Sequence, residues 1–390
     1  MAGPPSGAAG GDTSLLRRIN SAVTLRALRG GAHLTVTELM DATGLSRPTV
    51  EGVVDGLLHD GLVVEAEADA DTAGRRRGRP ARRFRFHAEA GHVLGLDIGM
   101  HEVRCVLADL TGTVVARHTR AVPGGLGAEE RLDRARGTVN DLLRRAKIPR
   151  EHLWAAGVGT PGIVDRQGVV TYSAAVPGWT GMDLGGRLTR SLPCPVFVEN
   201  DANLAVIGER WQGVAVGSDD VVLILAGLSP GAGSLIDGRV HRGFGGAAGE
   251  IGALHLLGRQ APPESLLSTT GTPLVPLDED AVADVFRLAR AGDPVAREAV
   301  DRFFQRLVHD ITALVLTLDP EIVVVGGWAT GIDDVIEPLR TELAKFCLRL
   351  PRVELSALGT DAIALGALRV AVDHAEQRLF SVEHAGAAHA

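Results

Sequence analysis

The chain has 390 residues, of which 45% are hydrophobic and 23% are charged, an ordinary composition for two or three folded domains with sizeable cores. Its formal net charge of −8 argues against indiscriminate binding to nucleic acid. The three cysteines, Cys105, Cys194 and Cys347, lie far apart in the sequence, which excludes a disulfide framework and a zinc finger built on paired cysteines.

The first residues, MAGPPSGAAGGD, have neither the basic region nor the apolar core of a signal peptide, and we interpret residues 1–12 as a disordered lead. The longest apolar runs, such as residues 221–228, are far shorter than the roughly 20 residues that cross a membrane. We therefore expect a cytoplasmic protein with no membrane partner.

Residues 34–64 have the apolar spacing of two short helices around a tight turn. Gly44 permits the positive φ of a sharp helix exit, and Ser46 is placed to cap the second helix. The apolar face of that helix would pack on an earlier helix, with Val50, Val54, Leu57 and Leu58 on one side and Leu15, Leu16, Ile19 and Val23 on the other. The pattern is typical of a helix-turn-helix, although any three-helix bundle has a similar period.

In a helix-turn-helix the first residues of the second helix meet base edges in the major groove of DNA. Here these are Ser46, Arg47, Pro48 and Thr49. Asp60-Gly61 then turns the chain into Leu62-Val63-Val64, a candidate first strand of a wing.

Residues 75–85, RRRGRPARRFR, hold seven arginines in eleven positions where the second strand of a wing should follow. A run of charge is usually a solvated face, but arginines on a narrow Gly/Pro loop suit a minor groove, so we select Arg77 and Arg79 as DNA contacts. Residues 1–90 hold 12 Lys and Arg and 11 Asp and Glu, a net charge of +1, and the rest of the chain carries −9. Contact with DNA should therefore be local to this N-terminal part.

From Gly91 the sequence changes to apolar strands that end in glycine-rich turns and alternate with helices, which predicts an α/β domain of two lobes. Backbone N–H groups of such turns commonly bind phosphate or polar ligands. In chain order we expect strands at residues 93–96, 103–108, 114–116 and 154–158, a helix at 128–147, a strand at 195–198, a helix to Trp211, a strand at 221–225, a hairpin turn at Asp237-Gly238, helix throughout 280–317 and a strand at 321–325.

Six motifs appear in the order in which the ROK (repressor, open reading frame, kinase) family has them: GLDIG at 95–99, GVGTPG at 157–162, ENDAN at 199–203, AGEIG at 248–252, Asp319-Pro320 with Gly326-Gly327, and ALGA at 364–367. The chain resembles this family from its first helix to about Val370. The resemblance implies an α/β fold with an N-terminal winged helix-turn-helix and a two-lobed actin-like ATPase body. The expected domains are 13–90, 91–200 and 201–390, with the C-terminal helix returning to the first lobe and a tail at 375–390.

The resemblance also implies ligand-binding roles. Asn200, Asp201 and Glu250 would bind sugar hydroxyls, and Asp201 would be the general base in the family's kinases. A structural role for Asp201, as the N-cap of the following helix, is compatible with that chemistry.

The sequence departs from the kinase pattern at three places. Met100 stands where a polar residue follows the first loop, Leu228 stands in the second phosphate loop, and Ala253 replaces a histidine that binds sugar and often zinc. The cysteines of that zinc site are also absent from residues 259–270. We therefore expect no metal, no cofactor and no catalytic residue, with Asp201 as the base if kinase activity survives.

The sequence favours a sequence-specific DNA-binding transcriptional regulator of carbohydrate-related metabolism that acts as a repressor. It would bind a double-stranded operator as a homodimer or homotetramer. A small sugar-like effector would occupy the degenerate cleft. Two alternatives stay open: a sugar kinase with a DNA-binding head, and a ligand-independent regulator with an empty pocket.

Overall fold

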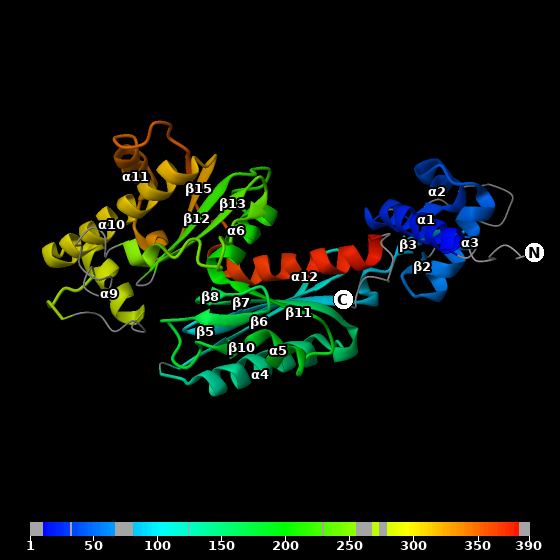
Figure 1. Cartoon of the computed structure of the whole chain (residues 1–390), viewed down its shortest axis with the longest axis horizontal. Coiled ribbons are helices and arrows are strands. Elements are labelled where there is room, and N and C mark those ends of the chain that lie inside the picture. The colour runs from blue at the N-terminus through cyan, green and yellow to red at the C-terminus, as the bar shows by residue number, and fades with distance from the viewer. Residues whose placement is uncertain are drawn as a thin grey trace, which may run out of the picture. The chain divides into compact units, whose positions relative to one another are not determined.

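The computed structural model describes residues 11–31, 33–66, 81–123, 125–227, 230–254, 267–272 and 279–381 (Figure 1). The chain divides into two compact units. The first comprises the residues up to Val93 together with Ala108–Thr113 and the residues from Val372 onward, and the second comprises Leu94–Leu107 and Val114–Ala371. No helix among the described residues is long and apolar enough to cross a membrane.

The first unit contains three helices and a small sheet near the N-terminus: α1 (Gly11–Arg29), α2 (Val36–Thr43), α3 (Arg47–His59), and strands β1 (Leu34–Thr35), β2 (Val63–Ala66) and β3 (Arg83–Phe86) in the order β1-β3-β2. A capping box starts α2, because the Thr35 hydroxyl accepts from Glu38 N and the Glu38 carboxylate accepts from Thr35 N. Gly44, at φ 71°, ends that helix in the left-handed conformation. The predicted break between two short helices is therefore present.

The core of these helices differs from the expected one on its α1 side. Helix α3 buries Val50, Val53, Val54 and Leu57, as its spacing indicates, but α1 meets it with Ala22, Leu25 and Leu28. Leu16 and Ile19 are 52% and 36% exposed. The packing face of α1 thus begins one to two turns later than the sequence suggested, and the expected contact through Leu16 and Ile19 is wrong.

The last turns of α12 (Ala362–Phe380) also belong to the first unit, where they contact α1. Arg29 pairs with Glu376 at 2.5 Å, and the guanidinium groups of Arg26 and Arg29 lie 5.2 and 5.5 Å from the centre of the Phe380 ring. Stacked arginines of this kind combine a cation–π attraction with apolar contact. The C-terminal end of the helix is therefore part of the folded first unit.

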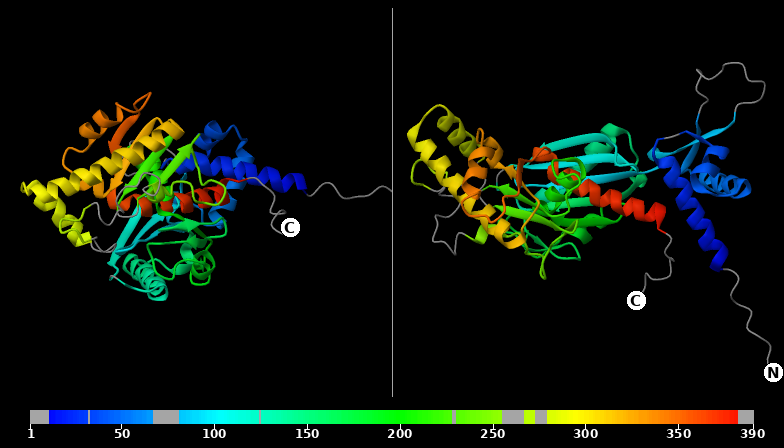
Figure 2. Two further views of the ribbon diagram at one scale, coloured as in Figure 1. Left: turned by 60° about the vertical axis from the view of Figure 1, so that its left-hand side comes forward. Right: turned by 90° about the horizontal axis from the view of Figure 1, so that it is seen from above.

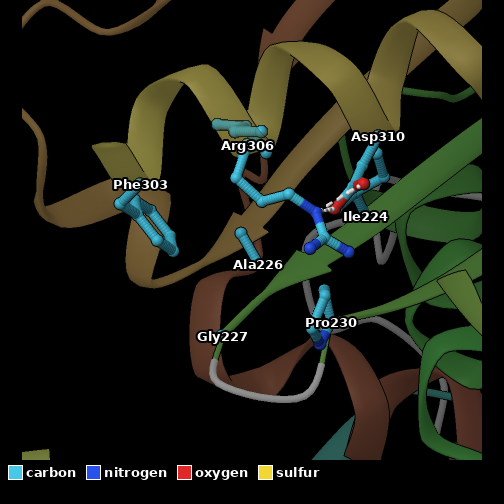
Figure 3. A pocket seen from close by; sticks show the side chains of 8 residues that line it. Ile224, Ala226, Gly227, Pro230, Phe303, Arg306 and Asp310 are labelled. Atoms are coloured by element: carbon cyan, nitrogen blue, oxygen red, sulfur yellow. Dashed lines mark hydrogen bonds and ion pairs between the residues drawn. The ribbon is translucent and has the colours of Figure 1, made fainter. Parts of the chain in front are cut away.

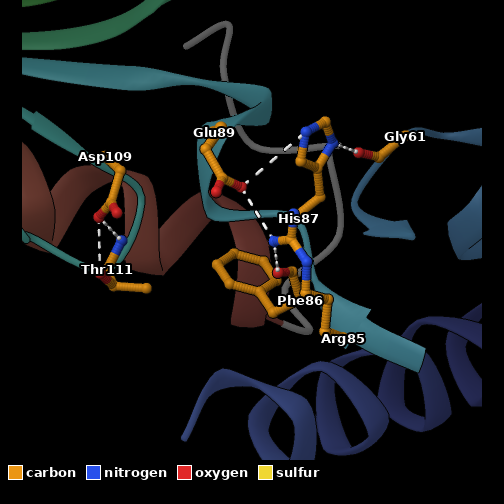
Figure 4. Close-up of polar contacts among 7 residues, drawn as sticks. All are labelled: Gly61, Arg85, Phe86, His87, Glu89, Asp109 and Thr111. Carbon is orange, nitrogen blue, oxygen red and sulfur yellow. Dashed lines mark hydrogen bonds and ion pairs between the residues drawn. The ribbon is translucent and has the colours of Figure 1, made fainter. Parts of the chain in front are cut away.

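The short helix η2 (Ala88–Ala90) follows β3, and polar contacts hold this segment in place (Figure 4). His87 Nδ1 lies 2.8 Å from the Gly61 carbonyl oxygen, and Arg85 pairs with Glu89 at 3.1 Å. Leu110 N donates to the Ala88 carbonyl. The turn after α3 and the strand β3 are thus joined to the segment that leads into the rest of the chain.

The second unit contains two mixed five-stranded sheets. The first has the order β11-β7-β4-β5-β6, with β4 (His92–Ile98), β5 (Glu102–Asp109), β6 (Val114–Ala121), β7 (Leu153–Thr160) and β11 (Val196–Asn200). Helices α4 (Ala128–Ala146) and α5 (Leu184–Thr189) lie on one face of this sheet and α12 lies on the other (Figures 1 and 2). This part of the chain also contains a short helix, η3 (Arg150–His152), and a small sheet of order β10-β9-β8. Its strands are β8 (Ile163–Val164), β9 (Val169–Tyr172) and β10 (Met182–Asp183).

The second sheet has the order β14-β13-β12-β15-β16, with β12 (Val221–Ala226), β13 (Gly231–Ile236), β14 (Arg239–Val240), β15 (Ile322–Gly327) and β16 (Arg352–Leu355). Its central strands are continuous apolar runs because both faces are covered. Val222, Ile224, Val323 and Val325 face α9 (Glu279–Arg290), α10 (Pro294–Leu318) and α11 (Ile336–Leu343), and the alternate residues face α6 (Asp201–Gln212). The remaining short helices are η4 (Ile251–Leu254), η5 (Trp328–Gly331) and η6 (Gly359–Asp361).

Most predicted strands lie where the sequence indicated, and Asp237-Gly238 has the positive φ angles of 50° and 71° that a tight hairpin turn needs. The helix expected throughout 280–317 is instead two helices. Helix α9 ends at Arg290, and Gly292 follows it in the left-handed conformation at φ 95°. The Asp293 carboxylate then accepts hydrogen bonds from Val295 N and Ala296 N and so caps α10, whose first residue is Pro294.

Three glycines of the first sheet lie where helices pack on it, and of these Gly159 was expected to begin a glycine-rich turn after its strand. Gly95 lies within β4, and Gly157 and Gly159 lie within β7. A Cβ atom at Gly95 or Gly157 would overlap the Ala364 or Ala367 carbonyl of α12. Gly95 and Gly157 let the backbone of α12 approach the sheet closely, and Gly159 continues β7 past the expected strand end at residue 158.

Candidate functional site

The predicted DNA-contacting residues Ser46, Arg47, Pro48 and Thr49 lie together at the start of α3, where the first three are exposed and Thr49 is partly buried. Ser46 occupies the N-cap position, but its hydroxyl bonds to the Thr49 hydroxyl at 2.8 Å and makes no cap to the helix backbone. The expected capping role of the Ser46 side chain is therefore wrong.

Arg47 is the first residue of α3 and its side chain is 54% exposed. Its two terminal nitrogens contact different partners: Nη2 donates to the Thr37 hydroxyl at 3.1 Å, and Nη1 lies 3.4 Å from the Glu51 carboxylate. A guanidinium held in this way keeps donors in a fixed fork, the geometry that matches the acceptor edge of guanine.

Arg77 and Arg79 lie outside the described residues. The nearest described arginines of the same run pair with acidic side chains: Arg82 with Glu65 at 2.9 Å, Arg83 with Glu38 at 3.3 Å, and Arg85 with Glu89 at 3.1 Å. The pKa of Glu38 is lowered, first by its bonds from Thr35 and then by Arg83. The described part of the arginine run is thus locally balanced in charge.

The predicted ligand-binding residues Asn200 and Asp201 lie where β11 ends and α6 begins. Asn200 is the N-cap of α6: its Oδ1 accepts from Asn203 N at 3.1 Å, and its Nδ2 donates to the Gly162 carbonyl and to Asp201 Oδ1. The N-cap role considered for Asp201 is therefore wrong. Asp201 is the first helical residue, with Oδ1 accepting from Ala202 N at 2.8 Å.

Glu199 is a further residue of this cluster that the sequence reasoning missed, and it is 8% exposed. Its Oε1 accepts from Asn200 N and Asn203 Nδ2, and its Oε2 accepts from Arg242 Nε at 2.5 Å. Arg242 lies two residues after β14. The pair fixes the segment that leads to Glu250 beside the start of α6, and the 43 residues between the partners left no local sign of it in the sequence.

Three carboxyl groups interact around this point. Burial raises the pKa of Asp201 to about 7, and the negative charge of Glu250 adds to this increase. The two predicted ligand-binding carboxyls therefore lie close enough to interact electrostatically. Glu250 as a whole residue is exposed, but the surrounding protein partly excludes water from its carboxyl, which raises the pKa of that carboxyl. Asp97 is 5% exposed, and its Oδ1 has no hydrogen-bond partner among the described residues. Its pKa is raised well above the ordinary value by burial and then by the charges of Asp201 and Glu102.

A cluster of this kind can accept hydrogen bonds from hydroxyl groups, since ionised carboxylates are acceptors and protonated ones also donate. With a pKa near 7, Asp201 could also accept a proton at neutral pH. Among the described residues, no group of three or more His, Cys, Asp or Glu side chains is arranged to hold a metal ion.

The positions that depart from the kinase pattern lie in different environments. The turn at Met100 has its carbonyls occupied: buried Arg131 of α4 donates to the Gly99 and Met100 carbonyl oxygens. Ala253 lies in η4. Leu228 lies outside the described residues.

Gly227 and Pro230 line a narrow, mostly apolar pocket of only about 10 Å³ at the end of β12 (Figure 3). Arg306 and Asp310 of α10 form a buried ion pair there, with Arg306 Nε 2.8 Å from both carboxylate oxygens. A cation and an anion already joined in this way leave little net charge to attract a phosphate.

Two known proteins show how much of the chain has relatives. A xylose repressor of Caldicellulosiruptor bescii is 23% identical over 394 residues, which cover 93% of this chain and 97% of the repressor. A glucokinase of Halalkalibacterium halodurans is 27% identical over 310 residues, which cover 70% of this chain and 92% of the kinase.

The fold is also that of a solved structure, a ROK family transcriptional regulator described as a homologue of the Escherichia coli MLC protein. It aligns with a TM-score of 0.67 at 19% identity and covers 95% of this chain and all of that one (100%). The body accordingly has the actin-like kinase fold with mixed α/β sheets. Residues 93–374 match the sequence model of the ROK family, and the chain belongs to that family.

Proposed function

We propose that this chain is a sugar-related transcriptional repressor. It would bind operator DNA through a winged helix-turn-helix formed by α1, α2, α3 and the β1-β3-β2 sheet. A sugar-like effector held by Asn200, Asp201 and Glu250 would alter that binding. The protein would act in the cytoplasm as a homodimer or homotetramer.

The observation that carries this proposal is the extent of the match to the xylose repressor. Because that match covers 93% of the chain, it must include most of the residues that precede the family match, which begins at residue 93. The match to the glucokinase covers 70%. Because the repressor shares both the body and the N-terminal part, the comparison supports a regulatory role for the chain more than the role of a metabolic enzyme.

The start of α3 suits a DNA interface. Ser46, Arg47 and Pro48 are exposed on the first turn, the part of a recognition helix that meets base edges. β2 and β3 would form the wing, with Arg77 and Arg79 between them entering a minor groove. In a dimer, two such heads would face half-sites about 34 Å apart, one turn of DNA.

The effector would act through the carboxyl cluster of the body. A ligand changes DNA affinity only if it binds one arrangement of the protein more tightly than another. Sugar hydroxyls could donate to Asp201 and Glu250, whose mutual repulsion they would relieve. An uncharged polyol therefore suits this cluster better than an anion.

One observation favours a second function, that of a sugar kinase with a DNA-binding head. The pKa of Asp201, about 7, is what a general base for phosphoryl transfer needs. Against it stand Met100, Leu228 and Ala253, and the turn carbonyls engaged by Arg131. We propose that the chain is not an enzyme, and sugar-dependent turnover of ATP that Asp201→Ala abolishes would reverse this choice.

The DNA-binding part of the proposal can be tested by selecting genomic fragments with the purified chain at physiological salt. We expect enrichment of one palindromic site. Arg47→Ala should lower discrimination among core base pairs, whereas Arg79→Ala should weaken binding chiefly at AT-rich flanks. The matched control is Arg144→Ala on α4, an exposed arginine outside the proposed interface. Equal binding to specific and random DNA by the wild-type chain would contradict the proposal.

A further inference from the structure

A second pocket, of about 320 Å³, lies at α4 and α5 of the second unit. Its lining comes from Arg136, Val139 and Asn140 of α4, Leu188 of α5, and Arg150, Ser191 and Leu192 beside them. Pockets of roughly 300 to 1,000 Å³ are the size that small-molecule ligands occupy. None of these residues belongs to the carboxyl cluster or to the start of α3.

The floor of the pocket is apolar. Val139 and Leu188 are each 2% exposed, and Leu192 is 7% exposed, so their side chains also belong to the core of the first sheet. A ligand that displaced water from this floor would gain the hydrophobic contribution of a few buried carbon groups. The floor therefore favours a ligand with an apolar portion.

The rim is cationic. Among the described residues that line the pocket, the charged groups are the guanidinium groups of Arg136 and Arg150. Arg150 is held by neutral acceptors, since Nη1 donates to Asn140 Oδ1 at 2.9 Å and Nη2 donates to the Ser191 carbonyl. Arg136 is held by Asp133 at 2.9 Å and by the Arg187 carbonyl.

These contacts leave donors for a ligand. Each guanidinium has five N–H groups, and the bonds above use two on each arginine. Asp133 is 73% exposed, and an ion pair so open to solvent offsets little of the charge of Arg136. Two arginines fixed in advance also lose less conformational entropy when an anion binds.

We propose that this pocket binds the oxyanion of a small organic acid or phosphate ester whose apolar portion rests on Val139, Leu188 and Leu192. The site is separate from the proposed sugar-effector cluster and prefers the opposite chemistry, an anion in place of an uncharged polyol. It would give the chain a second small-molecule input. An acidic segment of a partner protein is the competing occupant, but a concave pocket with an apolar floor suits a compact molecule better.

Calorimetric titration of the full chain with phenyl phosphate tests the proposal, because that probe combines an oxyanion with an apolar ring. We expect saturable binding. Phenol lacks the charge and inorganic phosphate lacks the ring, so each should bind at least about tenfold more weakly. Absence of saturable phenyl phosphate binding would overturn the proposal, including in the case where an acidic peptide binds.

Asn140→Asp is the sharpest variant. An aspartate keeps the acceptor for Arg150 and adds a negative charge to the rim, so the fold should keep its stability while phenyl phosphate binding weakens at least about tenfold. Arg150→Gln should weaken binding similarly.

The matched control is Arg144→Gln, on the same helix and 75% exposed but absent from the pocket lining. It should change affinity by less than about twofold, as expected of a surface charge. Unchanged binding by Asn140→Asp, or an equal loss in Arg144→Gln, would refute the site. DNA binding by Asn140→Asp reports separately on the proposed function.

Discussion

Replacing Asp201 with asparagine should stabilise the second unit at neutral and higher pH. The Asp201 carboxyl has a pKa of about 7 in the folded chain, against an ordinary value of 3.8, because burial and Glu250 disfavour its charged form. Since the folded pKa is the higher one, the protonated carboxyl favours folding. That contribution is complete below about pH 4 and is lost as the pH rises through about 7.

The magnitude follows from the size of the shift. Each pKa unit corresponds to about 1.4 kcal/mol, so ionised Asp201 costs at most about 4 kcal/mol above pH 7. Part of this cost arises from the coupling of Asp201 with Glu250 and Asp97. We therefore expect the free energy of unfolding of the variant to rise by about 2 to 3 kcal/mol above pH 7. Asparagine keeps an oxygen that can accept from Ala202 N, so the start of α6 should remain intact.

Urea unfolding at about pH 4.5 and pH 8, followed by tryptophan fluorescence, measures the effect. All four tryptophans, Trp154, Trp179, Trp211 and Trp328, belong to the second unit, so the signal reports that unit. The stability gain of Asp201→Asn should be clearly larger at the higher pH, whereas Asp301→Asn, at an exposed position of α10, should show no such trend. A gain that is the same at both pH values would refute the reasoning about the buried carboxyl.

Three further changes test the packing and the interface. Gly157→Ala should destabilise the second unit by about 1 to 3 kcal/mol or prevent its folding, since the new methyl group meets the Ala367 carbonyl; thermal unfolding against Gly245→Ala, at a glycine with open space around it and no positive φ, checks this. Asp310→Asn should cost about 3 to 5 kcal/mol, because it leaves Arg306 buried without its carboxylate, and a loss below 1 kcal/mol in urea unfolding would show that the pair is not buried as described. Glu51→Ala should release Arg47 and reduce base discrimination less than Arg47→Ala does, and a larger loss in competition binding assays would mean that Glu51 itself contacts the bases.

Local patterns predicted much of the fold because their causes are local. Gly44 marked the end of a short helix, and Asp237-Gly238 marked a hairpin, since each needs a positive φ that few other residues adopt. The same local reasoning placed Arg47 at the first turn of α3.

Features that depend on distant segments were not predicted. Leu16 and Ile19 have helical apolar spacing, but which turn of α1 is covered depends on where α3 and α12 meet it. The close packing of α12 on Gly157 was not predicted, because the sequence does not show that α12 crosses β7. The bonds of Arg242 to Glu199 and of Arg131 to Met100 join residues 43 and 31 positions apart, with no local signature of either.

The most direct test of the account is the affinity of the chain for its selected DNA site, measured with and without each of a panel of sugars, amino sugars and sugar phosphates. The account predicts that one uncharged compound lowers this affinity and that Glu250→Gln reduces the response while leaving DNA binding without ligand unchanged. If the site is bound tightly and no compound alters its affinity, the carboxyl cluster is not an effector site and the chain is a ligand-independent regulator.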